Sequence, residues 1–326
     1  MIRKKDFSLN KSVAPPKSVQ MKEILRCGSD ASYFINTYIK IPHPLKGMLK
    51  FDTFPFQDDC LKKFQENRFV IVNKSRQLGL STVSAGYALW MALFQKEKNI
   101  LVIATKFETS KLFLKKVEAM LDSLPSWLVM PKLKARTVKN IDFSNGSKIK
   151  AIPTSADAGR GEALSLLIVD EAAHVEGIDE LWLGLSPTLS TGGSAILIST
   201  PSGVGTFFHK IWEGAKNETN NFIPIELPWT VHPERDQAWF EDQRKAIIDA
   251  IGERGVAQEL LCDFSSAGDT FLRSDVMDRI YADIREPKQM WGPIWTHKRD
   301  LWIWEGVKTN HKYNFNTNYK KIAYRL

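Results

Sequence analysis

Residues 69–95 combine a candidate anion-binding loop with the two elements that would hold it. Residues 69–73 form a short apolar, β-branched run typical of a buried strand, and residues 74–80 form a polar loop that contains Gly79. From Ser81 onward, apolar side chains recur at helical spacing. A strand, a glycine loop and a helix direct backbone N–H groups and the positive end of the helix dipole at one anion. The stretch therefore indicates a phosphate-binding loop.

This loop departs from the usual Walker A signature, G-x-x-x-x-G-K-[ST], at two places. Gly79 fits the tight turn, and Ser81 fits the hydroxyl that binds Mg²⁺. Ser75 stands in for the first glycine, and Leu80 replaces the lysine. Because leucine cannot neutralise a phosphate, a positive charge must come from another residue. Leu80→Lys would restore the usual loop, so we expect this substitution to be tolerated or to raise activity.

Two basic residues at the start of the loop could supply that charge. Lys74 and Arg76 lie where the loop begins to wrap around the phosphates, so either could reach the β- and γ-phosphates. Arg76 is predicted to be catalytic, and its loss is expected to slow hydrolysis at least as much as the loss of Lys74. The nucleotide-binding residues predicted in the loop are Lys74, Ser75, Arg76, Gln77, Leu78, Gly79, Leu80, Ser81 and Thr82.

A second stretch supplies paired carboxylates. Residues 166–169 form a fully apolar strand that ends in Asp170 and Glu171, about 90 residues after the loop. Adjacent carboxylates directly after a buried strand are costly unless they are used. In nucleotide hydrolases of the Walker B type, the first carboxylate holds Mg²⁺ and the second polarises the attacking water. The sequence thus predicts Mg²⁺ at Ser81 and Asp170, and Glu171 as a catalytic residue in ATP hydrolysis.

Two further pairs of side chains fit beside these motifs. Phe56 and Gln57 lie about 20 residues before the loop, and a glutamine can donate to and accept from the adenine edge at once. Ser199 and Thr200 follow another short apolar strand, where hydroxyls could sense the γ-phosphate and relay its loss. We therefore predict that Phe56 and Gln57 bind the base and that Ser199 and Thr200 couple hydrolysis to movement.

Strand-like and helix-like patterns alternate along the chain, which predicts an α/β fold with a mainly parallel central sheet flanked by helices. In such sheets, ligands bind at the carboxyl ends of the strands, where the loop and the carboxylate pair are expected. A glutamate beside the metal-binding aspartate points to a RecA-like (ASCE) P-loop ATPase. Asn145-Gly146 predicts a hairpin. Other expected elements are strands at 99–105, 195–198 and 222–227 and helices at 107–124, 236–251 and 253–262.

Composition limits the class of protein. The 326 residues carry a net charge of +8, which makes a polyanionic partner plausible. The three cysteines show no C-x-x-C spacing, so we expect reduced core thiols in a reducing cytosol. No apolar run approaches about 18 residues and no signal peptide is evident, so no membrane partner is expected.

The predicted organisation is a flexible basic arm (1–20), an ATPase domain (21–264), and a linker with a further short segment (265–326). The linker signal is at 265–268.

In order and spacing, these motifs resemble the large terminase subunit of tailed bacteriophages, in its contractile-tail form, over about residues 32–313. The matching pieces are Ile41-Pro42-His43-Pro44 with Phe56-Gln57, Ser75-Arg76-Gln77-Leu78-Gly79, Arg160-Gly161 ahead of Ile168-Val169-Asp170-Glu171-Ala172-Ala173, and Ser199-Thr200-Pro201-Ser202-Gly203 followed by Phe207-Phe208 and Ile211-Trp212.

The resemblance implies an ATP-driven motor that pumps double-stranded DNA into a procapsid. It implies as partners the portal protein, the small terminase subunit and other copies of the chain, in a ring on the procapsid and monomeric when isolated. It also implies a location in the host cytoplasm, at the portal during assembly, and not as a stable part of the mature virion. Arg160, flanked by Gly159 and Gly161, would be an arginine finger that reaches the γ-phosphate of the neighbouring subunit.

Two other functions stay open at this point. One is a helicase-like ATPase that remodels nucleic acid without packaging it. A strand-separating element in the sequence would distinguish such a protein from a packaging motor. The other is a nucleotide-binding scaffold with little turnover, a reading motivated by Leu80. A phosphate-release assay separates the scaffold from the enzyme.

Related terminases also carry a C-terminal nuclease domain with a carboxylate cluster, and here the sequence departs from them. Residues 314–326 contain no Asp or Glu, and the last carboxylate side chain is that of Glu305. A two-metal nuclease needs several carboxylates to hold its ions. We interpret residues 265–326 as a linker and the truncated entrance to an absent nuclease domain, and we expect no DNA cleavage with Mg²⁺ or Mn²⁺. A plasmid-nicking assay checks this expectation, and nicking by carefully purified protein would contradict it.

Overall fold

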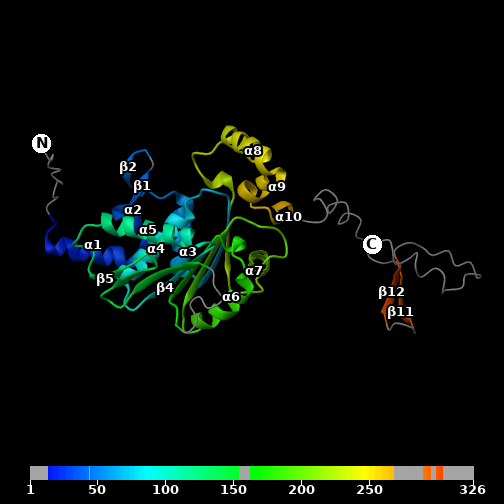
Figure 1. Ribbon diagram of the computed structural model, residues 1–326, viewed down its shortest axis with the longest axis horizontal. Helices are drawn as coiled ribbons and strands as arrows, with labels where there is room; N and C mark the ends of the chain where they lie inside the picture. Colours follow the sequence, from blue (N-terminus) through cyan, green and yellow to red (C-terminus); the bar gives the residue numbers. More distant parts are fainter. Residues whose placement is uncertain (1–13, 44, 154–161, 268–288, 295–298, 304–326) are drawn as a thin grey trace, which may run out of the picture. The chain divides into compact units, whose positions relative to one another are not determined.

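The computed structural model describes residues 14–43, 45–153, 162–267, 289–294 and 299–303. The chain divides into two compact units, residues 1–269 and 270–326, which are described separately. The first unit carries the predicted motifs (Figure 1). In the second, β11 (Gln289–Ile294) pairs antiparallel with β12 (Arg299–Ile303).

An eight-stranded sheet forms the centre of the first unit (Figure 1). Six strands are parallel and two more, β6 and β5, continue the sheet antiparallel. The order is β10 (Ile223–Leu227), β3 (Phe69–Lys74), β9 (Ser194–Ser199), β8 (Leu166–Asp170), β4 (Asn99–Ala104), β7 (Lys148–Pro153), β6 (Asn140–Phe143) and β5 (Leu133–Arg136). The predicted mainly parallel α/β sheet is confirmed, and so is the hairpin at Asn145-Gly146, which joins β6 to β7. One strand, β9, separates the loop strand β3 from the carboxylate strand β8, as in RecA-like ATPases.

Helices cover both faces of the sheet because side chains along each buried strand alternate between two cores. Val70 and Val72 of β3 belong to one core, and Ile71 between them belongs to the other. The first core includes side chains of α1 (Lys17–Ser29), α2 (Ala31–Tyr38), α3 (Pro55–Glu66), α4 (Leu80–Phe94) and α5 (Phe107–Ser123). The second core includes side chains of η1 (Ala172–His174), α6 (Ile178–Leu185), η2 (Ser186–Leu189) and α7 (Phe207–Lys216).

A helical segment follows β10 and returns to the carboxyl ends of the strands. It comprises η3 (Trp229–Val231), α8 (Gln237–Ile251), α9 (Glu253–Val256), η4 (Ala257–Leu261) and α10 (Phe264–Ala267), coloured yellow to gold in Figure 1. The linker predicted from residue 265 is wrong for 265–267, which are helical. The ring of Phe264 explains this because it lies against Phe208, His209 and Trp212 and fixes α10 to the second core.

Two other segments near the N-terminus differ from expectation. Helix α1 begins at Lys17, so the last residues of the predicted flexible arm are helical, and the Gln20 side chain donates to the Pro15 carbonyl at 2.6 Å. The residues from Met21 to Ile41 have two short helical patterns in the sequence, but α2 ends at Tyr38, and β1 (Lys40–His43) with β2 (Gly47–Lys50) forms a small antiparallel hairpin. None of the helices described here is long and apolar enough to span a membrane.

Trp90 provides a test of how the N-terminal helices are fixed to the sheet. Its indole Nε1 donates to the Cys27 carbonyl at 2.7 Å, which joins α4 to α1. Trp90→Phe should lower the free energy of unfolding by about 1–3 kcal/mol because the buried carbonyl loses its donor. Chemical denaturation measures this. Trp182→Phe is the control, since the Trp182 indole has ring contacts with Phe207 and Phe222 and, within the described residues, no hydrogen bond. An equal loss in both variants would contradict the role of the hydrogen bond.

Candidate active site

The loop between β3 and α4 spans residues 75–79 and has a backbone shape that requires a glycine. Gln77 and Gly79 both lie in the left-handed region, with φ of 59° and 74°. A Cβ atom on Gly79 would come within 2.8 Å of Gln57 Nε2. Any larger residue here would therefore strain the turn and displace Gln57.

The most informative feature of the loop is a row of backbone N–H groups. Within the described residues, the N–H groups of residues 77–81 donate to no protein acceptor. The groups on either side are engaged: Arg76 N–H donates to the Glu259 carbonyl at 2.7 Å and Thr82 N–H to the Gly79 carbonyl at 2.9 Å. Five consecutive amides at the start of the 15-residue helix α4 form a site for an anion with several oxygens.

Asp170 lies at the end of β8 with one oxygen that has no partner. The side chain is 5% exposed, and within the described residues its Oδ1 accepts no hydrogen bond. Burial, and then the neighbouring Glu171 carboxylate, raises the pKa of Asp170, whereas a hydrogen bond with the Ser81 side chain opposes that rise. A buried carboxylate oxygen without a partner, beside a hydroxyl, fits a divalent cation. Mg²⁺ is bound through one or two carboxylates together with phosphates and waters.

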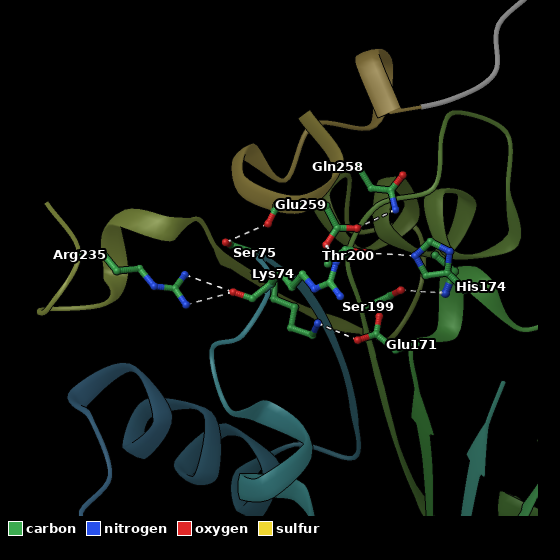
Figure 2. A network of polar contacts seen from close by, with 11 residues as sticks. Lys74, Ser75, Glu171, His174, Ser199, Thr200, Arg235, Gln258 and Glu259 are labelled. Carbon is green, nitrogen blue, oxygen red and sulfur yellow. Dashed lines mark hydrogen bonds and ion pairs between the residues drawn. The ribbon is translucent and has the colours of Figure 1, made fainter. Parts of the chain in front are cut away.

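Glu171 makes an ion pair across the sheet. The residue adopts a left-handed conformation, with φ of 55°, immediately after β8. Its Oε1 accepts from Lys74 Nζ at 3.0 Å, and the Lys74 side chain is only 6% exposed (Figure 2). The sequence-predicted Lys74, Asp170, Glu171 and Ser81 thus come together at the carboxyl end of the sheet.

Arg76 is placed differently from Lys74. Its side chain is 67% exposed, and its Nη1 lies 3.4 Å from Glu259 Oε2. Four residues separate the two glycines of the usual signature, so counting back from Gly79 puts the first glycine's position at Lys74. The prediction that Ser75 stands in for that glycine is therefore wrong. Leu80 is 1% exposed and belongs to the first core, and the expectation that a lysine there restores the usual loop stays a prediction.

Residues from the helical segment after β10 fasten the start of the loop (Figure 2). Ser75 Oγ donates to the Glu259 carbonyl at 3.1 Å, and Ser75 N–H donates to the Leu227 carbonyl at 2.7 Å. The Arg235 guanidinium donates to the Arg76 carbonyl at 3.2 Å and to the Gln77 carbonyl at 3.0 Å. The sequence pattern gave no sign of Glu259 or Arg235, because their partners are more than a hundred residues away along the chain.

The predicted coupling residues hold the turn that follows Glu171. Ser199 Oγ accepts from the Ala173 N–H at 3.0 Å, and Thr200 Oγ1 lies 3.1 Å from His174 Nε2 (Figure 2). His174 was not among the predicted site residues, although it lies three residues after Glu171 in the same motif. A movement of the Ser199–Thr200 turn would therefore act directly on the backbone that carries Glu171.

Phe56 and Gln57 lie at the start of α3, where both already have protein contacts. Gln57 is 3% exposed; its Oε1 accepts from Phe54 N–H at 3.1 Å and its Nε2 donates to the Leu78 carbonyl at 2.9 Å. Phe56 stacks on Phe54, and His232 lies 4.5 Å from Phe54 between ring centroids. Burial, and then Arg235, lowers the pKa of His232. In this structure Gln57 positions the loop, and its contact with a base stays a prediction.

A cavity of about 390 Å³ opens beside the carboxylates. Its lining joins the predicted site to α5 and β1: Pro42, Ser81, Thr109, Leu112, Phe113, Lys115, Lys116, Asp170 and Glu171. Burial lowers the pKa of Lys116, and the Asp170 charge opposes that effect.

The predicted arginine finger, Arg160, lies outside the described residues.

Solved structures with a similar fold are phage large terminases. The ATPase domain of the large terminase of Thermus phage P74-26 is 21% identical, with a TM-score of 0.51, covering 61% of this chain and 89% of that one. The bacteriophage HK97 large terminase is 16% identical with a TM-score of 0.59, covering 72% of this chain and 54% of that one. The large terminase of the thermophilic bacteriophage D6E, in complex with ADP, is 14% identical with a TM-score of 0.53, covering 65% and 54%. The chain thus spans about half the length of the HK97 and D6E terminases, and these likenesses show the fold.

The family itself is shown by a match to the sequence. The family model for the T4-like type of terminase large subunit, N-terminal part, matches residues 71–275, which is more than half of the chain. That range contains the unpartnered loop amides, the Asp170–Glu171 pair and the Ser199–Thr200 turn. This chain therefore belongs to the family of T4-like phage terminase large subunits, whose N-terminal part it matches.

Proposed function

We propose that this chain is the ATP-hydrolysing motor subunit of a viral DNA-packaging terminase, which translocates double-stranded DNA into a procapsid. The observation that carries the proposal is the row of five unpartnered amides, residues 77–81, at the same edge of the sheet as Asp170 and Glu171. The amides bind phosphate oxygens, and the carboxylates supply the metal ligand and the base that phosphoryl transfer to water requires.

ATP is the proposed substrate. The D6E large terminase has been solved in complex with ADP and with ATP-gamma-S, and its fold is similar to this one. In the present chain, the aromatic group of Phe54, Phe56 and His232 lies close to Gln57, which contacts the loop. An adenine would stack near these rings while its phosphates meet the loop amides.

Ser81 and Asp170 would hold Mg²⁺. Both side chains line the same cavity, and within the described residues Asp170 Oδ1 is buried without a partner. When bound, the ion neutralises charge on the phosphate oxygens.

Glu171 acts as the base that orients the attacking water and accepts its proton. In this structure Lys74 Nζ forms an ion pair with Glu171 Oε1 at 3.0 Å. Phosphate oxygens bound at the loop would compete with Glu171 for Lys74. Nucleotide binding would thus free the Glu171 carboxylate to orient the attacking water and accept its proton. Loss of the γ-phosphate reverses the competition, and the Ser199–Thr200 turn, bonded to Ala173 and His174, carries the change onward.

The proposed partners follow from the family. They are double-stranded DNA, the portal protein, the small terminase subunit and further copies of the chain in a ring on the procapsid, in the host cytoplasm. The net charge of +8 suits a polyanion. Arg160 is proposed as the arginine finger that one copy offers to the nucleotide of the next.

Glu171→Gln tests the proposed reaction. The amide cannot accept the proton of water, so we expect nucleotide affinity within about twofold of wild type and a loss of turnover of about a hundredfold or more. Phosphate release and equilibrium binding of ATP-gamma-S measure the two effects. Glu176→Gln, an exposed acid in the same segment, is the control and should keep the wild-type rate. Hydrolysis by Glu171→Gln at the wild-type rate would refute the site assignment.

Comparison of Lys74→Ala with Arg76→Ala tests which basic residue serves the phosphates. Lys74 contacts Glu171, whereas Arg76 is exposed and contacts Glu259. We therefore expect Lys74→Ala to lower kcat about tenfold or more beyond the effect of Arg76→Ala, in line with loss of a charge-assisted phosphate contact. Steady-state phosphate release measures both. The reverse order would show that Arg76 turns toward the phosphates when nucleotide binds.

A further inference from the structure

Lys116 on α5 is a cation that the proposed reaction does not yet use. It lines the cavity of about 390 Å³ together with Ser81, Asp170 and Glu171. Within the described residues, the structure gives Lys116 neither a hydrogen bond nor an ion pair at salt-bridge distance, and its long-range interaction with Asp170 is electrostatic. A partly buried ammonium group without a close anionic partner is costly for the fold, so a ligand that supplies oxygens would stabilise it.

The position of α5 places this cation on a different side of the reacting carboxylates from Lys74. Lys74 ends β3, and β9 separates β3 from the carboxylate strand β8. Helix α5 follows β4, the neighbour of β8 on its other side. A phosphate group held by the loop amides in front of Asp170 and Glu171 would thus have Lys74 on one side and the α5 cavity on the other.

The cavity has the size and the chemistry for a phosphate group. At about 30 Å³ for each water, a space of this volume holds a phosphate together with several waters. Lys115 and Lys116 supply positive charge, and Thr109 and Ser81 supply hydroxyl donors. Leu112, Phe113 and Pro42 form an apolar wall, which strengthens electrostatic contacts by limiting water.

We infer that Lys116 binds the terminal phosphate group of the substrate, as the γ-phosphoryl group of bound ATP or as the phosphate released from it. This rests on the proposed ATPase function and adds to it a second cation, supplied by the same chain from α5. An ammonium at this place would stabilise negative charge on the oxygens of the transferred group while Lys74 acts from the side of β3. It would also hold the released phosphate until it leaves through the cavity.

Lys116→Met tests the inference, with Lys111→Met as the matched control. Lys111 lies on the same helix but pairs with Glu108 and does not line this cavity. For Lys116→Met we expect ATP-gamma-S affinity and kcat to fall about tenfold to a hundredfold, with ADP affinity within about twofold of wild type. Lys116→Arg, which keeps the charge, should recover part of the loss. Binding of the two nucleotides and phosphate release measure these effects.

The two sources of the phosphate group give different results. If Lys116 binds the γ-phosphoryl group, ATP-gamma-S affinity falls. If it binds only the released phosphate, ATP-gamma-S affinity is kept, and inhibition by inorganic phosphate in the presence of ADP is lost in Lys116→Met.

Wild-type values of ATP-gamma-S affinity, kcat and phosphate inhibition in a folded Lys116→Met protein would overturn the inference while leaving the ATPase intact. If Lys116→Met does not fold, Lys116→Arg and Lys116→Gln decide, because a role for Lys116 requires the glutamine variant to be the weaker of the two. Absence of hydrolysis by the wild-type chain, with and without DNA, would instead count against the proposed function.

Discussion

The ion pair between Lys74 and Glu171 sets the geometry on which the rest of the site depends. Its two members come from positions 97 residues apart, at the ends of strands that have β9 between them. The Lys74 side chain is 6% exposed, so its ammonium cannot be left without an anion. The pair joins the ends of β3 and β8, and Glu171 makes it from a left-handed conformation directly after Asp170, which lines the same cavity as Ser81. Any anion that binds at the loop would therefore interact with a Lys74 ammonium that already has Glu171 as its partner.

The same constraint explains why the loop is fastened from outside. A loop whose amides are free for phosphate cannot stabilise itself through those amides, so its order must come from other contacts. Leu227 and Glu259 accept from its first N–H groups, and Arg235 donates to its carbonyls. Upstream, the Asn73 side chain donates to the Cys262 carbonyl at 2.9 Å. Hydrogen bonds therefore join the loop to Arg235 and to η4, so a displacement of the loop would act on these parts of the helical segment after β10.

Local chemistry explains which parts of this arrangement could be predicted from the sequence. The strand–loop–helix pattern, the Asp170–Glu171 pair after an apolar run and the Asn145-Gly146 hairpin each depend on neighbouring residues, and the structure has all three. Glu259 and Arg235 could not be predicted, because their contacts with the loop span 184 and 159 residues and nothing in their own surroundings distinguishes them from surface charges. For Gln57 the sequence predicted contact with a base, which stays a prediction, and its hydrogen bonds to Phe54 and Leu78 could not be predicted from the sequence.

Leu80 stands where the usual signature has its lysine, so the proposed function needs a positive charge from another place in the fold. Leu80 begins α4 and packs into the first core, which anchors the helix whose start binds the anion. In the proposed site the charge comes instead from Lys74, a buried residue at the end of the preceding strand. A lysine fixed by a strand is positioned more rigidly than one at the tip of a loop, because the sheet determines its backbone. Lys74 already contacts Glu171 in this structure, so under the proposed function the cation for the phosphates would also restrain the base until phosphates bind.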